Sequence, residues 1–175
     1  MRFQTPMTSI LNNKTKVTCL RFLYKYPANL TGRELAKMVK GAPSTIHRAM
    51  KELSHEQIVT FRNVGNSHIY EINKDNLIVT KILIPMFKEE DKLLTDFFKR
   101  LVRRIRGSPL KDKIISVALF GSVHERTEKP TSDIDLFILV KEMKDKKKAE
   151  NLIFDLDRET RPQINMGMEP YIKTI

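Results

Sequence analysis

The sequence predicts an α+β protein in which a helical connector joins two small domains. Three observations support this class. Residues 1–74 combine helical apolar spacing with one hairpin, residues 75–107 keep helical spacing, and two β-like apolar runs follow residue 113. We therefore expect domains at residues 1–74 and 109–175 with a connector at 75–108. The chain of 175 residues is long enough for two small cores.

The charge follows the same division. The chain has 32 Lys and Arg against 21 Asp and Glu, a net charge of +11 that favours a polyanionic partner. Residues 1–74 carry +8, residues 75–113 carry +4 and residues 114–175 carry −1. One cysteine excludes a disulfide scaffold and a Cys-based zinc cluster. No apolar stretch is long enough for a signal peptide core or a membrane span, so a soluble cytoplasmic protein is expected.

The first domain begins with three predicted helices. The first runs from about Thr8 to Tyr26 by its apolar spacing. The second begins at Thr31, where Glu34 completes a capping box. The third begins at Pro43, which suits a first helical turn, although Ala42 is a weak cap.

The outer face of the third helix is polar and basic. This surface suits the major groove of DNA, where Arg reads guanine edges and Ser or Thr hold phosphates. Its residues are Ser44, Thr45, His47, Arg48 and Lys51.

A hairpin follows, with strands at 58–62 and 67–72 around an Asn/Gly turn. Residues 8–73 thereby resemble the winged helix-turn-helix family of prokaryotic DNA-binding proteins. The resemblance implies that the outer face of the third helix meets the major groove of double-stranded DNA, and that Arg62 in the wing reaches phosphate or the minor groove. The alternative is a protein-interaction winged helix with a solvated basic face.

The connector is predicted to be helical from Asp75 to Gly107, with a break or kink at Pro85. Its apolar face is wide for a linker and must be covered. We expect it to form a homodimer interface; the alternative is packing within the chain.

The last third contains two strand-like runs. Residues 114–120 are almost wholly apolar, which predicts a strand covered on both faces. A second strand carries Asp133 and Asp135, which share one face because side chains alternate along a strand. Two carboxylates suit Mg²⁺, and the Gly121-Ser122 turn between the strands suits a phosphate.

This spacing resembles the nucleotidyltransferase superfamily built on the DNA polymerase β core, most closely the minimal nucleotidyltransferase domains of bacteria and archaea. The matching motifs are 120–123 and 130–136. The resemblance implies that Gly121, Ser122 and Ser132 bind a nucleoside triphosphate. It also implies that Asp133 and Asp135 hold Mg²⁺ and act in catalysis.

Two positions depart from the family pattern. Arg126 occupies a position where the family often has glycine. The third metal carboxylate is less clear: Glu169 is the best-placed acid on a strand after the charged helix at about 145–160. Alternation puts Glu169 opposite the neighbouring methionines, but leaves open whether it shares the face of Asp133. Asp155 and Asp157, on the helix, are expected to be solvated.

Two functions follow. The first is a Mg²⁺-dependent enzyme that transfers a nucleoside monophosphate from ATP or another NTP to an acceptor such as a partner toxin protein, while the DNA-binding domain regulates its own operon. The second is a transcriptional regulator whose nucleotidyltransferase-like domain senses nucleotide or only dimerises. An adaptor with neither activity is a third reading, which the uneven charge argues against.

Overall fold

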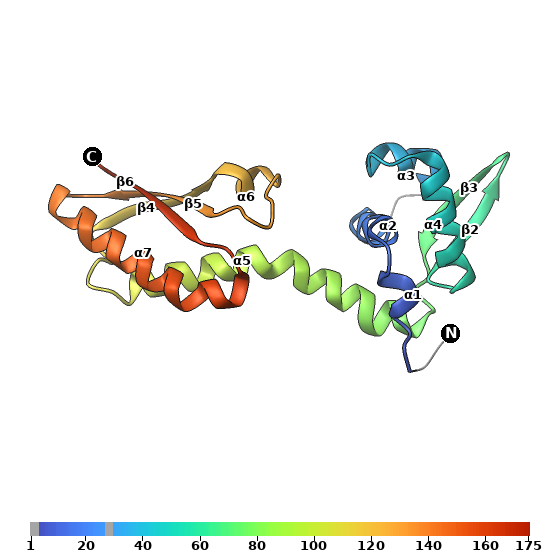
Figure 1. The fold of residues 1–175 in the computed structure, drawn as a ribbon, viewed down its shortest axis with the longest axis horizontal. Coiled ribbons are helices and arrows are strands. Elements are labelled where there is room, and N and C mark those ends of the chain that lie inside the picture. Colours follow the sequence, from blue (N-terminus) through green and yellow to red (C-terminus); the bar gives the residue numbers. More distant parts are fainter. Residues whose placement is uncertain (1–3, 27–29) are drawn as a thin grey trace. The chain divides into compact units, whose positions relative to one another are not determined.

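The computed structural model describes residues 4–26 and 30–175, and contacts divide the chain into two compact units. The first unit is Met1–Leu93 and the second is Leu94–Ile175. Each unit combines helices with a three-stranded sheet, so the protein is α+β as the sequence predicts (Figure 1). None of the helices within the described residues is long and apolar enough to cross a membrane.

The first unit opens with two helices where the sequence predicts one. Helix α1 (Thr8–Leu11) ends before Asn13, and helix α2 (Lys14–Lys25) begins after it. The backbone of Asn13 is extended, and its side chain accepts a hydrogen bond of 2.7 Å from the Thr15 amide. The prediction of one continuous helix is wrong because this capping bond stabilises a helix start at a position that apolar spacing does not mark.

The next two helices form the predicted helix-turn-helix. Helix α3 (Gly32–Met38) has a complete capping box: the Thr31 hydroxyl accepts from the Glu34 amide, and the Glu34 carboxylate accepts from the Thr31 amide. Helix α4 (Pro43–His55) begins at Ala42 without a side-chain cap. The apolar side of α4 is buried in the core of this unit.

A small antiparallel sheet completes this unit. Strand β3 (Ser67–Ile72) pairs with both β1 (Leu30–Thr31) and β2 (Val59–Val64), in the order β1-β3-β2. Gly65 turns the hairpin with φ of +55°, a conformation in which glycine avoids a steric penalty. The β2–β3 hairpin is the wing beside α4, so the first unit has a winged-helix architecture (Figure 1).

The segment after the wing is helical, with a different irregularity from the predicted one. A π-helical turn η1 (Val79–Leu83) leads into α5 (Ile84–Arg106). Pro85 follows this turn inside a continuous helix, so the π-helical turn lies where the missing N–H of proline disturbs the helical hydrogen bonds. The irregular turn therefore lies just before the proline, and α5 continues through it.

The second unit contains a mixed sheet. Strand β5 (Ile134–Val140) is central, antiparallel to β4 (Ile114–Phe120) and parallel to β6 (Met168–Thr174). Helix α7 (Met143–Ile164) makes the crossover between the two parallel strands. This is the mixed sheet with flanking helices that the sequence predicts.

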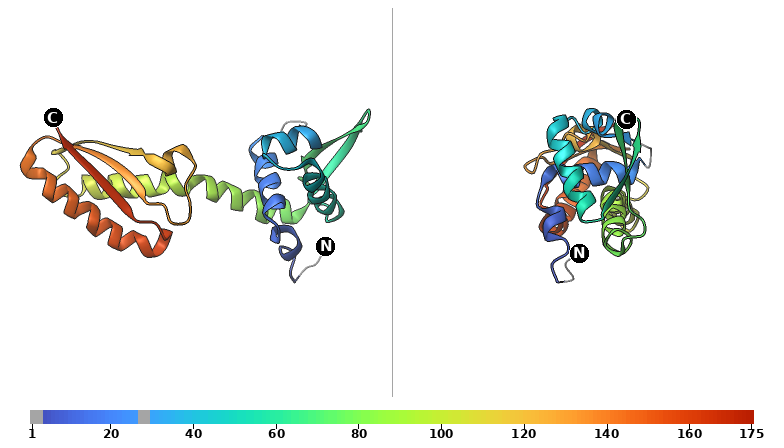
Figure 2. Two further views of the ribbon diagram at one scale, coloured as in Figure 1. Left: turned by 45° about the horizontal axis from the view of Figure 1, so that its top comes forward. Right: turned by 90° about the vertical axis from the view of Figure 1, so that its right-hand side faces the viewer.

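Helices α5 and α7 cover one face of this sheet (Figure 2). Leu136, Ile138 and Val140 of β5 have no exposed surface and pack against these helices. The other face is open, because Phe120 at the end of β4 is 42% exposed and Tyr171 of β6, which pairs with Phe137, is 51% exposed. The prediction that residues 114–120 are covered on both faces is wrong: β4 is an edge strand with helices on one side only.

Candidate functional site

Carboxylates from two neighbouring strands lie on the open face of the sheet in the second unit. Asp135 of β5 pairs with Phe120 of β4 on one side and with Glu169 of β6 on the other. Directly paired residues project to the same face, and Asp133 lies two residues before Asp135. Strand register therefore puts Glu169 on the face of Asp133 and Asp135, which answers the question that alternation leaves open.

The helix start that follows β4 lies against Asp135. Gly121 begins α6 (Gly121–Glu125) with φ of +69°, and a Cβ at this position would overlap the Asp135 carboxylate. Glycine is required here by both conformation and space. The first N–H groups of a helix lack intrahelical acceptors, so Gly121 and the half-buried Ser122 offer donors beside a carboxylate.

Ser132 closes the turn before Asp133. Its hydroxyl oxygen accepts a hydrogen bond of 2.9 Å from the Lys129 amide, and its own amide donates to the Lys129 carbonyl at 2.9 Å. The side chain thus has a structural role in addition to the predicted contact with nucleotide.

The backbone conformation at Arg126 explains why relatives often have glycine at this position. Arg126 ends α6 with φ of +58° and ψ of +36°, the left-handed conformation. This conformation costs a non-glycine residue about 1 kcal/mol or more. The backbone keeps the geometry that favours glycine, and the side chain is exposed.

Sequence reasoning missed a buried interaction at the start of β6. Asp157 of α7 is only 9% exposed, so the expectation that it is solvated is wrong, whereas Asp155 is exposed as expected. One oxygen of Asp157 accepts from the Met168 amide at 2.8 Å, and the other accepts from Arg161 at 2.7 and 3.0 Å. The sequence signal is the i, i+4 spacing of Asp157 and Arg161, which many solvated helical pairs share.

The donor chemistry of the open face fits Mg²⁺. Mg²⁺ is bound through one or two carboxylates together with water and substrate phosphates, and Asp133 and Asp135 are two such carboxylates. Among the residues that the structure describes, no group of three or more His, Cys, Asp or Glu is gathered tightly enough to hold a metal ion. The side chains that suit Mg²⁺ are therefore the two aspartates. Glu169 lies on the same face but does not form a tight three-residue group with them.

In the first unit, the predicted DNA-contacting residues of α4 are all exposed: Ser44, Thr45, His47, Arg48 and Lys51. Three of them line two separate hollows, and Ser44 and Thr45 line neither. His47 faces the wing, and Arg48 and Lys51 line a hollow on the side of α1.

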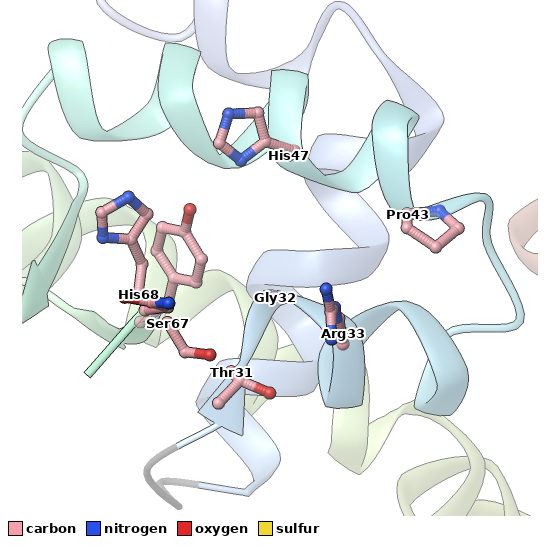
Figure 3. A pocket seen from close by; sticks show the side chains of 9 residues that line it. Thr31, Gly32, Arg33, Pro43, His47, Ser67 and His68 are labelled. Atoms are coloured by element: carbon pink, nitrogen blue, oxygen red, sulfur yellow. The ribbon is translucent and has the colours of Figure 1, made fainter. Parts of the chain in front are cut away.

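The hollow on the wing side has a volume of about 550 Å³. Figure 3 shows His47 of α4, Arg33 of α3, and Ser67 and His68 of β3 around it. Arg33 and His68 were missed because their partners in the hollow come from other elements. The only signal for His68 is its alternation with Tyr70, which also lines the hollow.

Arg62 lies on the other face of the wing. It pairs with Ile69 across the hairpin, so its side chain projects away from His68 and Tyr70. Arg62 is exposed but does not join the hollow.

A buried lysine controls the charge beside the α4 surface. Lys16 is 4% exposed, and its Nζ lies 2.6 Å from the Glu52 carboxylate and 2.7 Å from the Ser9 carbonyl oxygen. The hydrogen bond from Lys16 lowers the pKa of Glu52. Glu52 is therefore charged but neutralised, and the outer surface of α4 keeps its basic character.

Comparison with protein families finds a match in the second unit. The family model "Polymerase beta, Nucleotidyltransferase" matches residues 108–167. No curated protein matches the sequence.

Several solved structures are similar to this chain at low sequence identity. They include MepR, a transcription regulator of the Staphylococcus aureus multidrug efflux pump MepA, at 12% identity and a TM-score of 0.40 over 53% of this chain and 75% of that chain. An S. aureus MepR-DNA complex has 10% identity and a TM-score of 0.41, covering 58% and 84%. A mutant of Lactococcus lactis ZitR has 14% identity and a TM-score of 0.37, covering 57% and 64%.

TM-scores of this size do not establish a shared fold, so the winged-helix description rests on the helices and the wing themselves. The nucleotidyltransferase description rests on the family match together with the strand, glycine turn and Asp-x-Asp strand that lie inside it. Residues 108–167 are therefore a nucleotidyltransferase domain of the polymerase beta family, within a chain whose first unit is a winged helix.

Proposed function

We propose that the second unit transfers a nucleoside monophosphate from an NTP, such as ATP, to an acceptor hydroxyl. The observation that supports this most is the arrangement around Asp135: the Gly121 backbone lies against its carboxylate, and Glu169 is its partner on β6. The turn that we propose to bind phosphate thus lies next to the carboxylates that we propose to bind metal, on an accessible face of the sheet.

The residues have separate roles in this proposal. Asp133 and Asp135 hold Mg²⁺, and the N–H groups at Gly121 and Ser122, with Ser132, bind the triphosphate. Bound Mg²⁺ supplies charge neutralisation at the phosphates and activation of the acceptor oxygen. The acceptor hydroxyl loses its proton to solvent as its oxygen forms a bond to the α-phosphorus, the bond from that phosphorus to the bridging oxygen breaks, and pyrophosphate leaves. The open face leaves room for a large acceptor, such as a partner toxin protein.

Labelled ATP, Mg²⁺ and proteins encoded next to this gene test the proposal. We expect label transfer in the wild type and its loss in Asp133→Asn and Asp135→Asn. Asp155→Asn is the matched control, because this exposed carboxylate lies on α7 and pairs with Arg158. Transfer that survives both active-site changes would rule out this site.

We also propose that the first unit binds double-stranded DNA and regulates its own operon in the cytoplasm. The supporting observation is that α4 presents five exposed polar or basic residues while Lys16 neutralises the nearby Glu52. Ser44, Thr45, His47, Arg48 and Lys51 contact the major groove, and Arg62 contacts phosphate from the wing.

DNA affinity at several salt concentrations tests this half. Replacing Arg48 and Lys51 with Ala removes two phosphate or base contacts, and we expect the slope of log K against log salt to fall by about 2. The control is Lys81→Ala with Lys88→Ala, which removes equal charge at exposed positions outside α4. Equal slopes for the two double variants would contradict the role of α4.

We further propose a homodimer through the connector region, specifically the exposed side of α5. Phe97, Leu101 and Ile105 are buried under the sheet, whereas Phe98 and Val102 face a separate hollow rimmed by Lys99, Arg103 and Arg106. Light scattering measures the mass. A dimer that becomes a monomer in Phe98→Ser with Val102→Ser supports the proposal, and a monomeric wild type contradicts it.

The competing function is a regulator whose second unit binds nucleotide without catalysis. The absence of a tight group of three metal-binding side chains among the described residues favours it. Nucleotide that changes DNA affinity in the absence of any label transfer would identify this alternative.

A further inference from the structure

A guanidinium group lies beside the aspartate pair. A Cβ on Gly167 would lie 2.5 Å from both Arg161 Nη2 and Asp133 Oδ1, so these two atoms are within about 5 Å of each other. Gly167 also accepts a hydrogen bond of 2.7 Å from the Ile134 amide, which ties this backbone to the start of β5. Glycine at 167 is therefore what lets Arg161 approach Asp133.

Asp157 fixes the guanidinium in this place. It accepts from Nε and Nη2 of Arg161 with the same oxygen, while its other oxygen accepts from the Met168 amide. A guanidinium has five N–H donors in a planar fork, so the remaining donors can bind another oxygen ligand. The Arg161 side chain is 58% exposed, which leaves those donors accessible.

The charge of Arg161 has opposite effects on the binding of a free metal ion and of a triphosphate. Hydrogen bonding to Asp157 raises the pKa of Arg161, and the negative charges of Asp157 and Asp133 add to this effect. A divalent cation held by Asp133 would bring positive charge close to Arg161, which opposes binding of the metal by itself. A triphosphate would attract both groups, because phosphate oxygens accept from Arg and also bind the metal.

We propose that Arg161 is a positioning residue that makes metal binding at Asp133 depend on the nucleotide. It weakens the binding of the free metal and donates to a phosphate oxygen of the incoming nucleotide, so the metal and nucleotide bind together. The inference rests on the proposed nucleotidyl transfer and adds a binding role to a side chain outside the family motif.

Mn²⁺ titration of the full chain, followed by electron paramagnetic resonance, tests this inference without turnover. The titration is run alone and with α,β-methylene-ATP, which cannot release pyrophosphate. In Arg161→Gln we expect free Mn²⁺ to bind about threefold more tightly. We expect the tightening of Mn²⁺ binding by the nucleotide to fall about tenfold.

Arg158→Gln is the matched control, since it removes the same charge from α7 at a side chain that is 82% exposed. It should behave as the wild type. If Arg161→Gln matches Arg158→Gln in both titrations, the inference is overturned while the proposed function stands. If wild-type protein binds no Mn²⁺ even with α,β-methylene-ATP present, or if Asp133→Asn then binds Mn²⁺ equally well, the proposed function fails and the inference fails with it.

Arg161→Lys separates charge from geometry and also decides the question if Arg161→Gln does not fold. Lysine keeps the charge but not the planar fork. We expect it to bind free Mn²⁺ as the wild type does, with a weaker effect of the nucleotide. A full nucleotide effect in Arg161→Lys, or tighter binding of free Mn²⁺, would overturn the inference.

Discussion

Asp157 of α7 accepts a hydrogen bond of 2.8 Å from the backbone amide of Met168, the first residue of β6. This bond joins the crossover helix α7 to β6, the strand that follows it in the chain. Because Met168 pairs with Ile134 and the next residue pairs with Asp135, the bond also helps to fix the position of Glu169. One buried carboxylate thus connects the stability of this unit with the arrangement of its site.

Replacing Asp157 with Ala should lower the free energy of unfolding by about 2–3 kcal/mol. The change leaves a buried Met168 amide without an acceptor and removes the ion pair with Arg161. Urea denaturation followed by circular dichroism measures this. Asp155→Ala, at an exposed position of the same helix, should change stability by less than about 0.5 kcal/mol. Equal losses in the two variants would contradict the structural role of Asp157.

Glu169→Gln should reduce label transfer by about tenfold or more, because a neutral amide on the face of Asp135 contributes less to metal binding than a carboxylate. Asp133→Asn and Asp135→Asn should reduce it by about 100-fold or more. Initial rates with labelled ATP at several Mg²⁺ concentrations measure both. A Glu169→Gln rate equal to that of the wild type at limiting Mg²⁺ would exclude Glu169 as a ligand.

Gly121→Ala should be far more harmful than Gly65→Ala, although both glycines have positive φ. At Gly65 an added Cβ meets nothing within 4 Å, so the cost is about 1 kcal/mol from the backbone conformation alone. At Gly121 the Cβ also overlaps the Asp135 carboxylate, and the helix start or the carboxylate must move. Thermal denaturation and Mn²⁺ titration compare the two variants. Similar losses of stability and of Mn²⁺ affinity in both would contradict the close approach of the Gly121 backbone to Asp135.

Arg126→Gly should stabilise the protein by about 1 kcal/mol, because glycine adopts the left-handed conformation at Arg126 without a Cβ penalty. Arg126→Ala is the control: it removes the same side chain but keeps the penalty, so its stability should stay near that of the wild type. The midpoint of urea unfolding distinguishes the two. A Gly variant no more stable than the Ala variant would show that this backbone carries no strain.

Cys19 should react slowly with thiol reagents in the folded protein. Burial of the side chain raises the pKa of the Cys19 thiol from 9.0 to about 11, so very little thiolate is present at pH 8. The protonated thiol stabilises the folded state below about pH 9, and this contribution is lost as the pH rises towards 11. Ellman's reagent, with and without urea, measures the rate. A folded-state rate close to the unfolded one would contradict this burial.

Much of the local structure could be predicted because it depends on residues close together in the chain. The capping box of Thr31 with Glu34 and the proline at the start of α4 mark helix starts through bonds within one turn. The split between α1 and α2 was missed because Asn13 can cap a helix or lie on its surface, and apolar spacing does not distinguish these. The π-helical turn before Pro85 likewise has no apolar signature.

The candidate site was predictable only in part. Alternation along one strand predicted that Asp133 and Asp135 share a face, and the sequence motif indicated the turn at Gly121. The side of Glu169 depends on the register between β5 and β6, which are joined by the whole of α7. The exposure of β4 depends on which elements cover the sheet, which an apolar run does not reveal.

The sequence by itself indicated a basic winged helix at residues 1–74 and a nucleotidyltransferase motif in the near-neutral stretch 114–175, because periodicity, caps and motif spacing are properties of neighbouring residues. The tertiary structure decided which distant side chains meet: Glu169 beside Asp135, His68 facing the hollow of His47, and Arg161 beside Asp133 across Gly167. The physical reason is that strand register and helix packing arise from burying one common core. Short-range patterns along the chain do not contain that information.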